Sequence, residues 1–254
     1  MGGKIECYID IASYYSYLAF VHLEQNHELL RQSGVTVDIH PFLIGAISVG
    51  SGNRPPWVVK AKARYLKHYD TKRASGALGV KNLSAPDDLM VAGKTIMPMR
   101  ALIYIKANFP IEVFNAALSY LFHAFWTLHK VPNSAPILTE VLSEIPADFQ
   151  LDCLKPFNRP TAARVVSSKS LFTREQVARI VEATGKDELK AALKARVDEA
   201  LARGSFGAPW IWLTDAQGRT EPVFGNDRWD CVYEFLQVPY QKLQLLPPPQ
   251  KAKL

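Results

Sequence analysis

Strand-forming patterns occur only near the two ends of this 254-residue chain, and this distribution limits how it can fold. In residues 5–10 and 35–39 apolar and polar side chains alternate, which predicts two strands that each bury one face. A helical pattern over 14–32 separates them, so we expect a β-α-β unit with parallel strands. Strand patterns return at 208–214 and 220–224, around a hairpin turn at 215–218. One sheet is therefore built from both ends of the chain.

The long stretch between these ends has helical periodicity. The predicted helices cover about 58–75, 97–108, 111–129, 135–145, 173–184 and 187–203. Thr173-x-x-Gln176 is a candidate capping box, 42–57 is predicted to be a loop, and a last helix opens at Gly225 or Asn226. We divide the chain into the first part of an α/β domain (1–62), an all-helical insertion domain (63–186), and the second part with a Pro-rich tail (187–254).

Composition excludes several classes of protein. Hydrophobic residues make up 48% of the chain, but no apolar run is long enough to span a membrane. The three cysteines are odd in number and widely spaced, which favours a reducing compartment without disulfides. The net charge of +6 suits small anionic ligands. Because the basic residues are scattered without an aromatic–basic motif, we expect no nucleic-acid partner. No zinc, EF-hand or phosphate-loop spacing is present, so we expect no metal.

Ser13 is the first candidate for chemistry, because it stands between the first strand and the following helix. A thiol oxidoreductase would carry Cys-x-x-Cys at this junction, and here both positions, Ser13 and Ser16, are serines. Ser13 can simply cap the helix. It can also hold a thiolate from a ligand, since a helix N-terminus offers up to about 2 kcal/mol and a charge-assisted hydrogen bond about 1.5–3. Half-ionising a thiol of pKa about 8.5 at neutral pH requires only about 2 kcal/mol. No histidine is needed as a base.

Three further segments could contribute to a ligand site. Phe206-Gly207-Ala208-Pro209 precedes the third strand, where a proline is either an ordinary strand start or a cis proline beside the first helix. Gly225-Asn226-Asp227-Arg228 either caps the last helix or binds an α-carboxylate through N–H groups and an α-ammonium through Asp227. The segment 51–56, followed by Lys60 and Lys62, is either a surface turn or a site for a terminal carboxylate.

Together these four segments resemble the kappa class of glutathione transferases and the related 2-hydroxychromene-2-carboxylate isomerases. The resemblance extends from Tyr8 to Arg228 and implies a thioredoxin-like α/β fold interrupted by an all-helical insertion, as in DsbA-like proteins. It also implies a homodimer. The chain departs from the pattern at Tyr14, where the family commonly has proline, and at Asn226, where it often has serine.

The resemblance also implies a role for each candidate residue. Ser13 is the catalytic serine that contacts the glutathione sulfur. Asn53 and Lys62 contact the tripeptide near its glycyl end, and Ala208, before a cis Pro209, pairs with the cysteinyl backbone. Asn226 and Asp227 hold the γ-glutamyl group.

The sequence is compatible with three functions. The first is glutathione transfer to a small hydrophobic electrophile, as in detoxification, with Tyr14, Tyr15 and Trp57 as possible pocket-lining aromatic residues. The second is glutathione-dependent isomerisation, and the third is a non-catalytic glutathione-binding module. A disulfide oxidoreductase is disfavoured because the site has no cysteine. The last three residues, Ala252-Lys253-Leu254, resemble a peroxisomal address, with the cytoplasm or mitochondrial matrix as alternatives.

Overall fold

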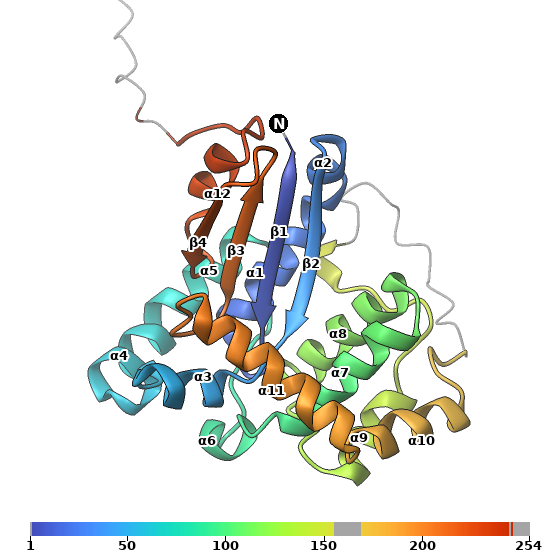
Figure 1. Cartoon of the computed structure of the whole chain (residues 1–254). Helices are drawn as coiled ribbons and strands as arrows, with labels where there is room; N and C mark the ends of the chain where they lie inside the picture. Colours follow the sequence, from blue (N-terminus) through green and yellow to red (C-terminus); the bar gives the residue numbers. More distant parts are fainter. Residues whose placement is uncertain (1, 155–168, 244, 246–254) are drawn as a thin grey trace, which may run out of the picture.

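The protein, seen in a computed structural model, is described over residues 2–154, 169–243 and 245. Its four strands are β1 (Gly3–Ile9), β2 (Val35–Pro41), β3 (Trp210–Asp215) and β4 (Thr220–Phe224). They form one sheet in the order β2-β1-β3-β4 (Figure 1). β1 pairs parallel to β2 and antiparallel to β3, and β4 pairs antiparallel to β3. The prediction of one sheet made from both chain ends is confirmed.

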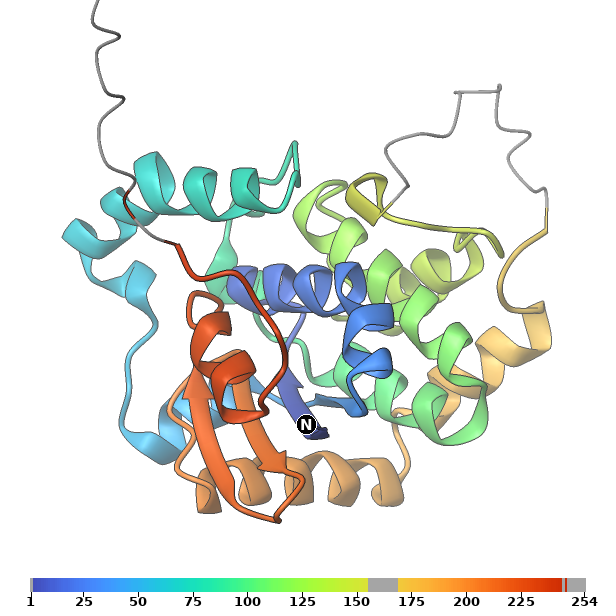
Figure 2. The same ribbon diagram turned by 90° about the horizontal axis from the view of Figure 1, so that it is seen from above.

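Helices cover both faces of this sheet. The elements of its first part are α1 (Tyr14–Gln25), α2 (His27–Gln32) and α3 (Ile44–Ser51), and those of its second part are α11 (Asp187–Ala202) and α12 (Trp229–Phe235). Figure 2 shows α1 and α12 on one side of the sheet and α11 on the other. Because β1 lies at the centre under both layers, Tyr8 is fully buried, as is Asp10 just after the strand. The prediction that β1 buries only one face is therefore wrong.

The intervening segment is helical, as predicted. It contains the short turns η1 (Pro56–Val58), η2 (Leu66–Asp70) and η3 (Asp152–Leu154), and the helices α4 (Lys60–Tyr65), α5 (Thr71–Ala77), α6 (Leu89–Ala92), α7 (Ile96–Asn108), α8 (Ile111–Trp126), α9 (Ala135–Ser143) and α10 (Arg174–Ala183). The capping box at the start of α10 is confirmed, with Thr173 and Gln176 bonding each other's backbone. No described helix has the length and apolarity to cross a bilayer. The domain boundaries stay a prediction.

Two local predictions are wrong. The helix expected over 14–32 is broken at Asn26, whose side-chain amide bonds back to the His22 carbonyl. The loop expected at 42–57 contains α3. Its first amide, that of Ile44, is bonded by the carboxylate of the distant Asp10, and Gly50 fits closely against Leu201 of α11. A Cβ at Gly50 would lie 2.6 Å from a Leu201 methyl carbon.

The helical segment shares a core with the sheet and fixes α1 in place. Tyr17 of α1 stacks on Phe122 of α8, with ring centroids 4.8 Å apart. The Trp126 indole N–H donates to the carbonyl of Ile11 over 2.8 Å, just before α1 begins. The start of α1 is therefore held from both the sheet and the helical segment. The C-terminal Ala252-Lys253-Leu254 lies outside the described residues, and its role as an address stays a prediction.

Candidate functional site

Ser13 is the N-cap of α1 and also faces a second segment of the chain. Its hydroxyl oxygen accepts a hydrogen bond from the Ser16 N–H at 3.1 Å, and its hydroxyl donates to the carbonyl of Ala208 at 3.1 Å. The residue is only 4% exposed. The first turn of α1 contains no acidic residue, so no carboxylate of that turn neutralises the positive end of the helix dipole. The prediction that Ser13 caps α1 is confirmed, and this cap is compatible with a contact between the Ser13 hydroxyl and a ligand thiolate.

The segment opposite Ser13 ends in a cis peptide bond between Ala208 and Pro209, as the resemblance implied. The Asn53 side chain donates to the carbonyl of Phe206 at 2.7 Å. The Gly225 N–H donates to the carbonyl of Pro209 at 3.2 Å. Three of the predicted segments therefore meet beside the start of α1, although 195 positions separate Ser13 from Ala208.

The segment 225–228 differs from its prediction. α12 begins at Trp229, after Arg228, so Asn226 does not cap it. Instead, the Asn226 side-chain oxygen accepts from the Trp229 indole N–H at 3.2 Å. Asp227 is exposed and pairs with Arg228 at 2.8 Å. A left-handed turn at Gly225, with φ of 93°, delays the helix and places both side chains before it.

An aromatic stack behind Asn226, which the sequence did not indicate, fixes Trp229. The Trp229 ring stacks on His22 of α1, with centroids 4.1 Å apart. The Tyr233 hydroxyl contacts His22 Nε2 at 2.5 Å. Burial lowers the pKa of His22 to about 4, so the imidazole is neutral near pH 7. Since the Asn226 oxygen accepts from Trp229, the N–H groups of its side-chain amide remain as the donors that an anion requires.

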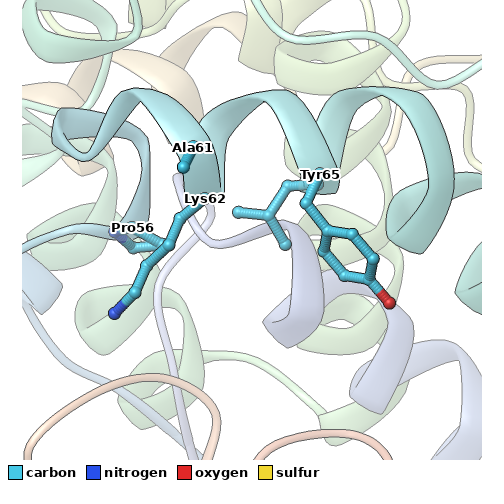
Figure 3. Close-up of a pocket in the computed structure, with 5 residues that line it drawn as sticks. Pro56, Ala61, Lys62 and Tyr65 are labelled. Atoms are coloured by element: carbon cyan, nitrogen blue, oxygen red, sulfur yellow. The ribbon is translucent and has the colours of Figure 1, made fainter.

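Lys62 lies on α4. It lines a pocket of about 350 Å³ with Pro56, Ala61, Tyr65 and Leu66. Figure 3 shows that Lys62 and Tyr65 point to the same side of the helix. Within the described residues, the structure gives no contact between Lys62 and the Ser13–Ala208 pair. The pocket combines an apolar lining with one ammonium group.

The aromatic residues proposed to line an acceptor pocket mostly hold elements together. The Tyr14 hydroxyl donates to the Thr71 carbonyl at 3.0 Å, and the Tyr15 hydroxyl donates to the Asp70 carboxylate. Burial and the negative charge of Asp70 raise the pKa of Tyr15, so it remains protonated. The Trp57 indole donates to the sulfur of Met90 at 3.2 Å. Tyr14 and Tyr15 thus fasten the η2–α5 segment to α1.

A buried carboxylate beneath the site was missed, because the sequence shows only a polar residue ending a strand. Asp10 accepts from the N–H groups of Ala12 and Ile44, each at 2.9 Å. It also accepts from the Thr95 hydroxyl at 2.7 and 2.9 Å. Burial raises the pKa of Asp10 to about 6 against the lowering effect of these donors. Asp10 therefore joins the segment before Ser13 to α3 and the segment before α7.

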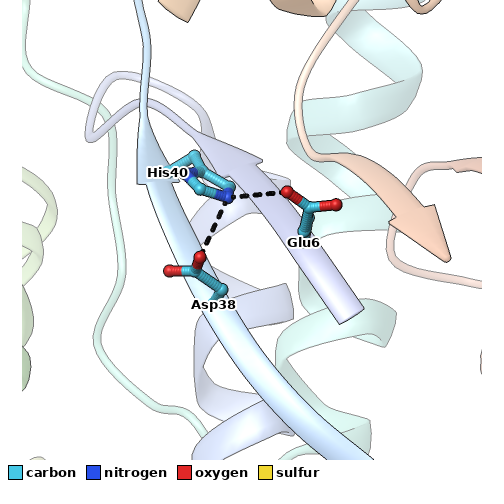
Figure 4. Close-up of side chains that lie close together, drawn as sticks. All are labelled: Glu6, Asp38 and His40. Carbon is cyan, nitrogen blue, oxygen red and sulfur yellow. Dashed lines mark ion pairs between the residues drawn. The ribbon is translucent and has the colours of Figure 1, made fainter. Parts of the chain in front are cut away.

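The face of the sheet under α11 carries a separate polar cluster, in which His40 Nε2 lies 3.3 Å from both Glu6 and Asp38 (Figure 4). These three side chains are close enough to share a metal ion. Lys4 lies 3.3 Å from both carboxylates, and Lys106 and Arg203 contact one carboxylate each. Because cations of the chain already compensate these acids, we assign the cluster to holding β1 and β2 against α7 and α11.

Comparisons with known proteins show the family and the relatives of the chain. Residues 4–150 match the family model of the DsbA-like thioredoxin domain. The chain is 24% identical over 242 residues to glutathione S-transferase kappa 2 of Caenorhabditis elegans, covering 93% of each chain. It is 23% identical to the human glutathione S-transferase kappa 1, covering 98% of this chain and 97% of that one.

A solved structure of 2-hydroxychromene-2-carboxylate isomerase superposes with a TM-score of 0.66 at 18% identity, covering 92% of this chain and 94% of that one. That likeness shows the fold. The chain therefore belongs to the DsbA-like thioredoxin-domain family, and kappa-class glutathione transferases are among its relatives.

Proposed function

We propose that this chain is a glutathione transferase that holds the glutathione sulfur as a thiolate at Ser13 and directs it at small hydrophobic electrophiles. One observation carries the proposal: the buried Ser13 hydroxyl lies at the positive end of α1, 3.1 Å from the carbonyl before the cis proline. The kappa-class names of the relatives support the same reaction class.

The chemistry needs little beyond this geometry. A free thiol of pKa about 8.5 is only a few per cent thiolate at pH 7. The end of α1 and the Ser13 hydroxyl both favour the charged form. The thiol proton leaves to water, the sulfur forms a bond to the electrophilic carbon, and the leaving group departs with its electron pair. No side chain has to act as general base.

The remaining candidate residues would bind the tripeptide. Ala208 pairs with the cysteinyl backbone, Asn226 donates to the γ-glutamyl carboxylate, and Asp227 pairs with its ammonium group. Asn53 acts on the same segment through its bond to Phe206. Lys62, beside an apolar pocket, would donate to the glycyl carboxylate. We also propose the homodimer that the resemblance implies, which sedimentation velocity tests.

Asp227→Ala is expected to raise the Kd for glutathione by about twofold to fivefold, because an exposed charge pair contributes up to about 1 kcal/mol. Isothermal titration calorimetry measures the change. Asp230→Ala, which removes an exposed acid from the first turn of α12, is the control and should bind glutathione like wild type. Equal affinities in the two variants would contradict the role of Asp227.

Trp229→Phe is expected to raise the Kd for glutathione by about threefold and to leave kcat unchanged. The ring remains on His22, but the indole N–H that orients the Asn226 amide is lost. Trp212→Phe on β3, whose ring packs on Arg203 instead, is the matched control. A change in kcat, or the same Kd in both variants, would count against this positioning role.

Glutathione-dependent isomerisation is the second candidate, favoured by the structural likeness to 2-hydroxychromene-2-carboxylate isomerase. Product mass separates the two. A transferase yields a product heavier by the glutathionyl group, whereas an isomerase returns the substrate mass unchanged. A panel of aryl halides and unsaturated carbonyl compounds, analysed by mass spectrometry, tests both. Tight binding without turnover on any of them would instead indicate a non-catalytic module.

A further inference from the structure

The Ser13 hydroxyl has a single hydrogen, and the structure shows where it is used. The Ser13 oxygen accepts a hydrogen bond from the Ser16 N–H. The hydroxyl hydrogen is not used in that bond, and it is donated to the Ala208 carbonyl. Donation to a thiolate requires this hydrogen to turn away from Ala208. Rotation about the Cβ–Oγ bond achieves that without moving the oxygen from the end of α1.

Turning the hydrogen away has a cost. Ala208 is 8% exposed and Ser13 4%, so the carbonyl between them has little access to water. A buried carbonyl left without a partner loses about as much free energy as one hydrogen bond. The thiolate therefore gains the full benefit of Ser13 only if another donor reaches the Ala208 carbonyl.

We propose that the site activates thiols carried by an N-acylated cysteine and not simple alkyl thiols, because the cysteinyl N–H takes over the Ala208 carbonyl and releases the Ser13 hydroxyl to the sulfur. This inference rests on the proposed function. The exchange would couple recognition of the cysteinyl backbone to activation of the thiol. The limiting group is the Ser13 hydroxyl, because it has one hydrogen to donate whereas the Ala208 carbonyl can accept two hydrogen bonds.

Three thiols test the exchange against wild type and Ser13→Ala. They are glutathione, γ-glutamylcysteine, which keeps the cysteinyl N–H, and a glutathione analogue in which an ester oxygen replaces that N–H. Thiolate absorbance at saturating ligand gives each bound ionisation constant relative to the free thiol. In wild type, glutathione and γ-glutamylcysteine should each gain about fivefold more in ionisation constant than the ester, the equivalent of one ordinary hydrogen bond. In Ser13→Ala, the three thiols should gain equally.

Each other outcome overturns something specific. If all three thiols ionise equally well on wild type, the exchange is wrong and the proposed function stands. If the ester deficit persists in Ser13→Ala, the hydroxyl is not the group released, and the exchange is again wrong. If wild type does not promote ionisation of any of the three, the proposed function and the exchange fall together.

Discussion

Ser13→Ala should lower the rate of glutathione conjugation at pH 7 by about tenfold to a hundredfold. The lost charge-assisted hydrogen bond is worth about 1.5–3 kcal/mol, which shifts the pKa of the bound thiol upward by about one to two units. The Kd for glutathione should stay within a few-fold, because the peptide contacts remain. The pH–rate profile measures the effect, and the variant should approach wild type at high pH, where the thiol ionises unaided.

Ser16→Ala is the matched control for that experiment. Ser16 lies one turn along the same helix, and its buried hydroxyl oxygen has no hydrogen-bond partner among the described residues. Its backbone N–H, which Ser13 caps, is unchanged by the substitution. An unaltered pH–rate profile in Ser13→Ala, or an equal shift in Ser16→Ala, would contradict the role of Ser13. Thermal unfolding of Ser13→Ala should show a loss of about 1 kcal/mol in stability, because this substitution removes the cap of α1.

Asp10→Ala should destabilise the protein by about 3–5 kcal/mol, the largest stability effect we expect. The substitution leaves buried donors on Ala12, Ile44 and Thr95 without their acceptor, each of which costs about 1–3 kcal/mol. Urea unfolding measures the loss. Thr95→Val removes one donor and keeps the carboxylate, so about 1 kcal/mol is expected from it. A loss below 1 kcal/mol in Asp10→Ala would show that water replaces the carboxylate.

The pH dependence of stability should report the same group. The pKa of Asp10 is raised to about 6 in the folded state, above about 3.9 in an unfolded chain. The folded state therefore binds this proton more tightly than the unfolded chain does. The resulting contribution to the free energy of unfolding is fully present below pH 4 and is lost as the pH rises through 6. The loss is about 3 kcal/mol. Because His22, with its lowered pKa, titrates in the opposite sense, the test is the difference between wild type and Asp10→Ala across this range.

Local patterns were sufficient for most of the fold. Strands and long helices follow from periodicity, which is a property of neighbouring residues. The wrong predictions concern elements whose conformation or burial depends on residues far away in the sequence. α3 forms because Asp10 bonds its first amide and Gly50 fits against Leu201, and no pattern inside 42–57 shows either contact. The second buried face of β1 depends likewise on α11, from the other end of the chain.

The site could be predicted where a motif carries it. Ser13 stands at the strand–helix junction, as its place in the sequence predicted, and the cis Ala208–Pro209 bond was implied by the family resemblance. The support of Asn226 by Trp229 and His22 could not be predicted, because it depends on a turn at Gly225 and a stack between helices far apart in sequence. Asn226 was predicted to cap α12 because the sequence does not show where this helix begins. In the structure α12 begins at Trp229, too far along the chain for Asn226 to cap it.

A crystal structure of the glutathione complex tests the central claim most directly. We predict that the tripeptide sulfur lies within hydrogen-bonding distance of the Ser13 hydroxyl and that the cysteinyl N–H bonds the Ala208 carbonyl. The γ-glutamyl end should lie at Asn226 and Asp227. A tripeptide bound away from the start of α1, or one whose sulfur turns away from Ser13, would contradict the account.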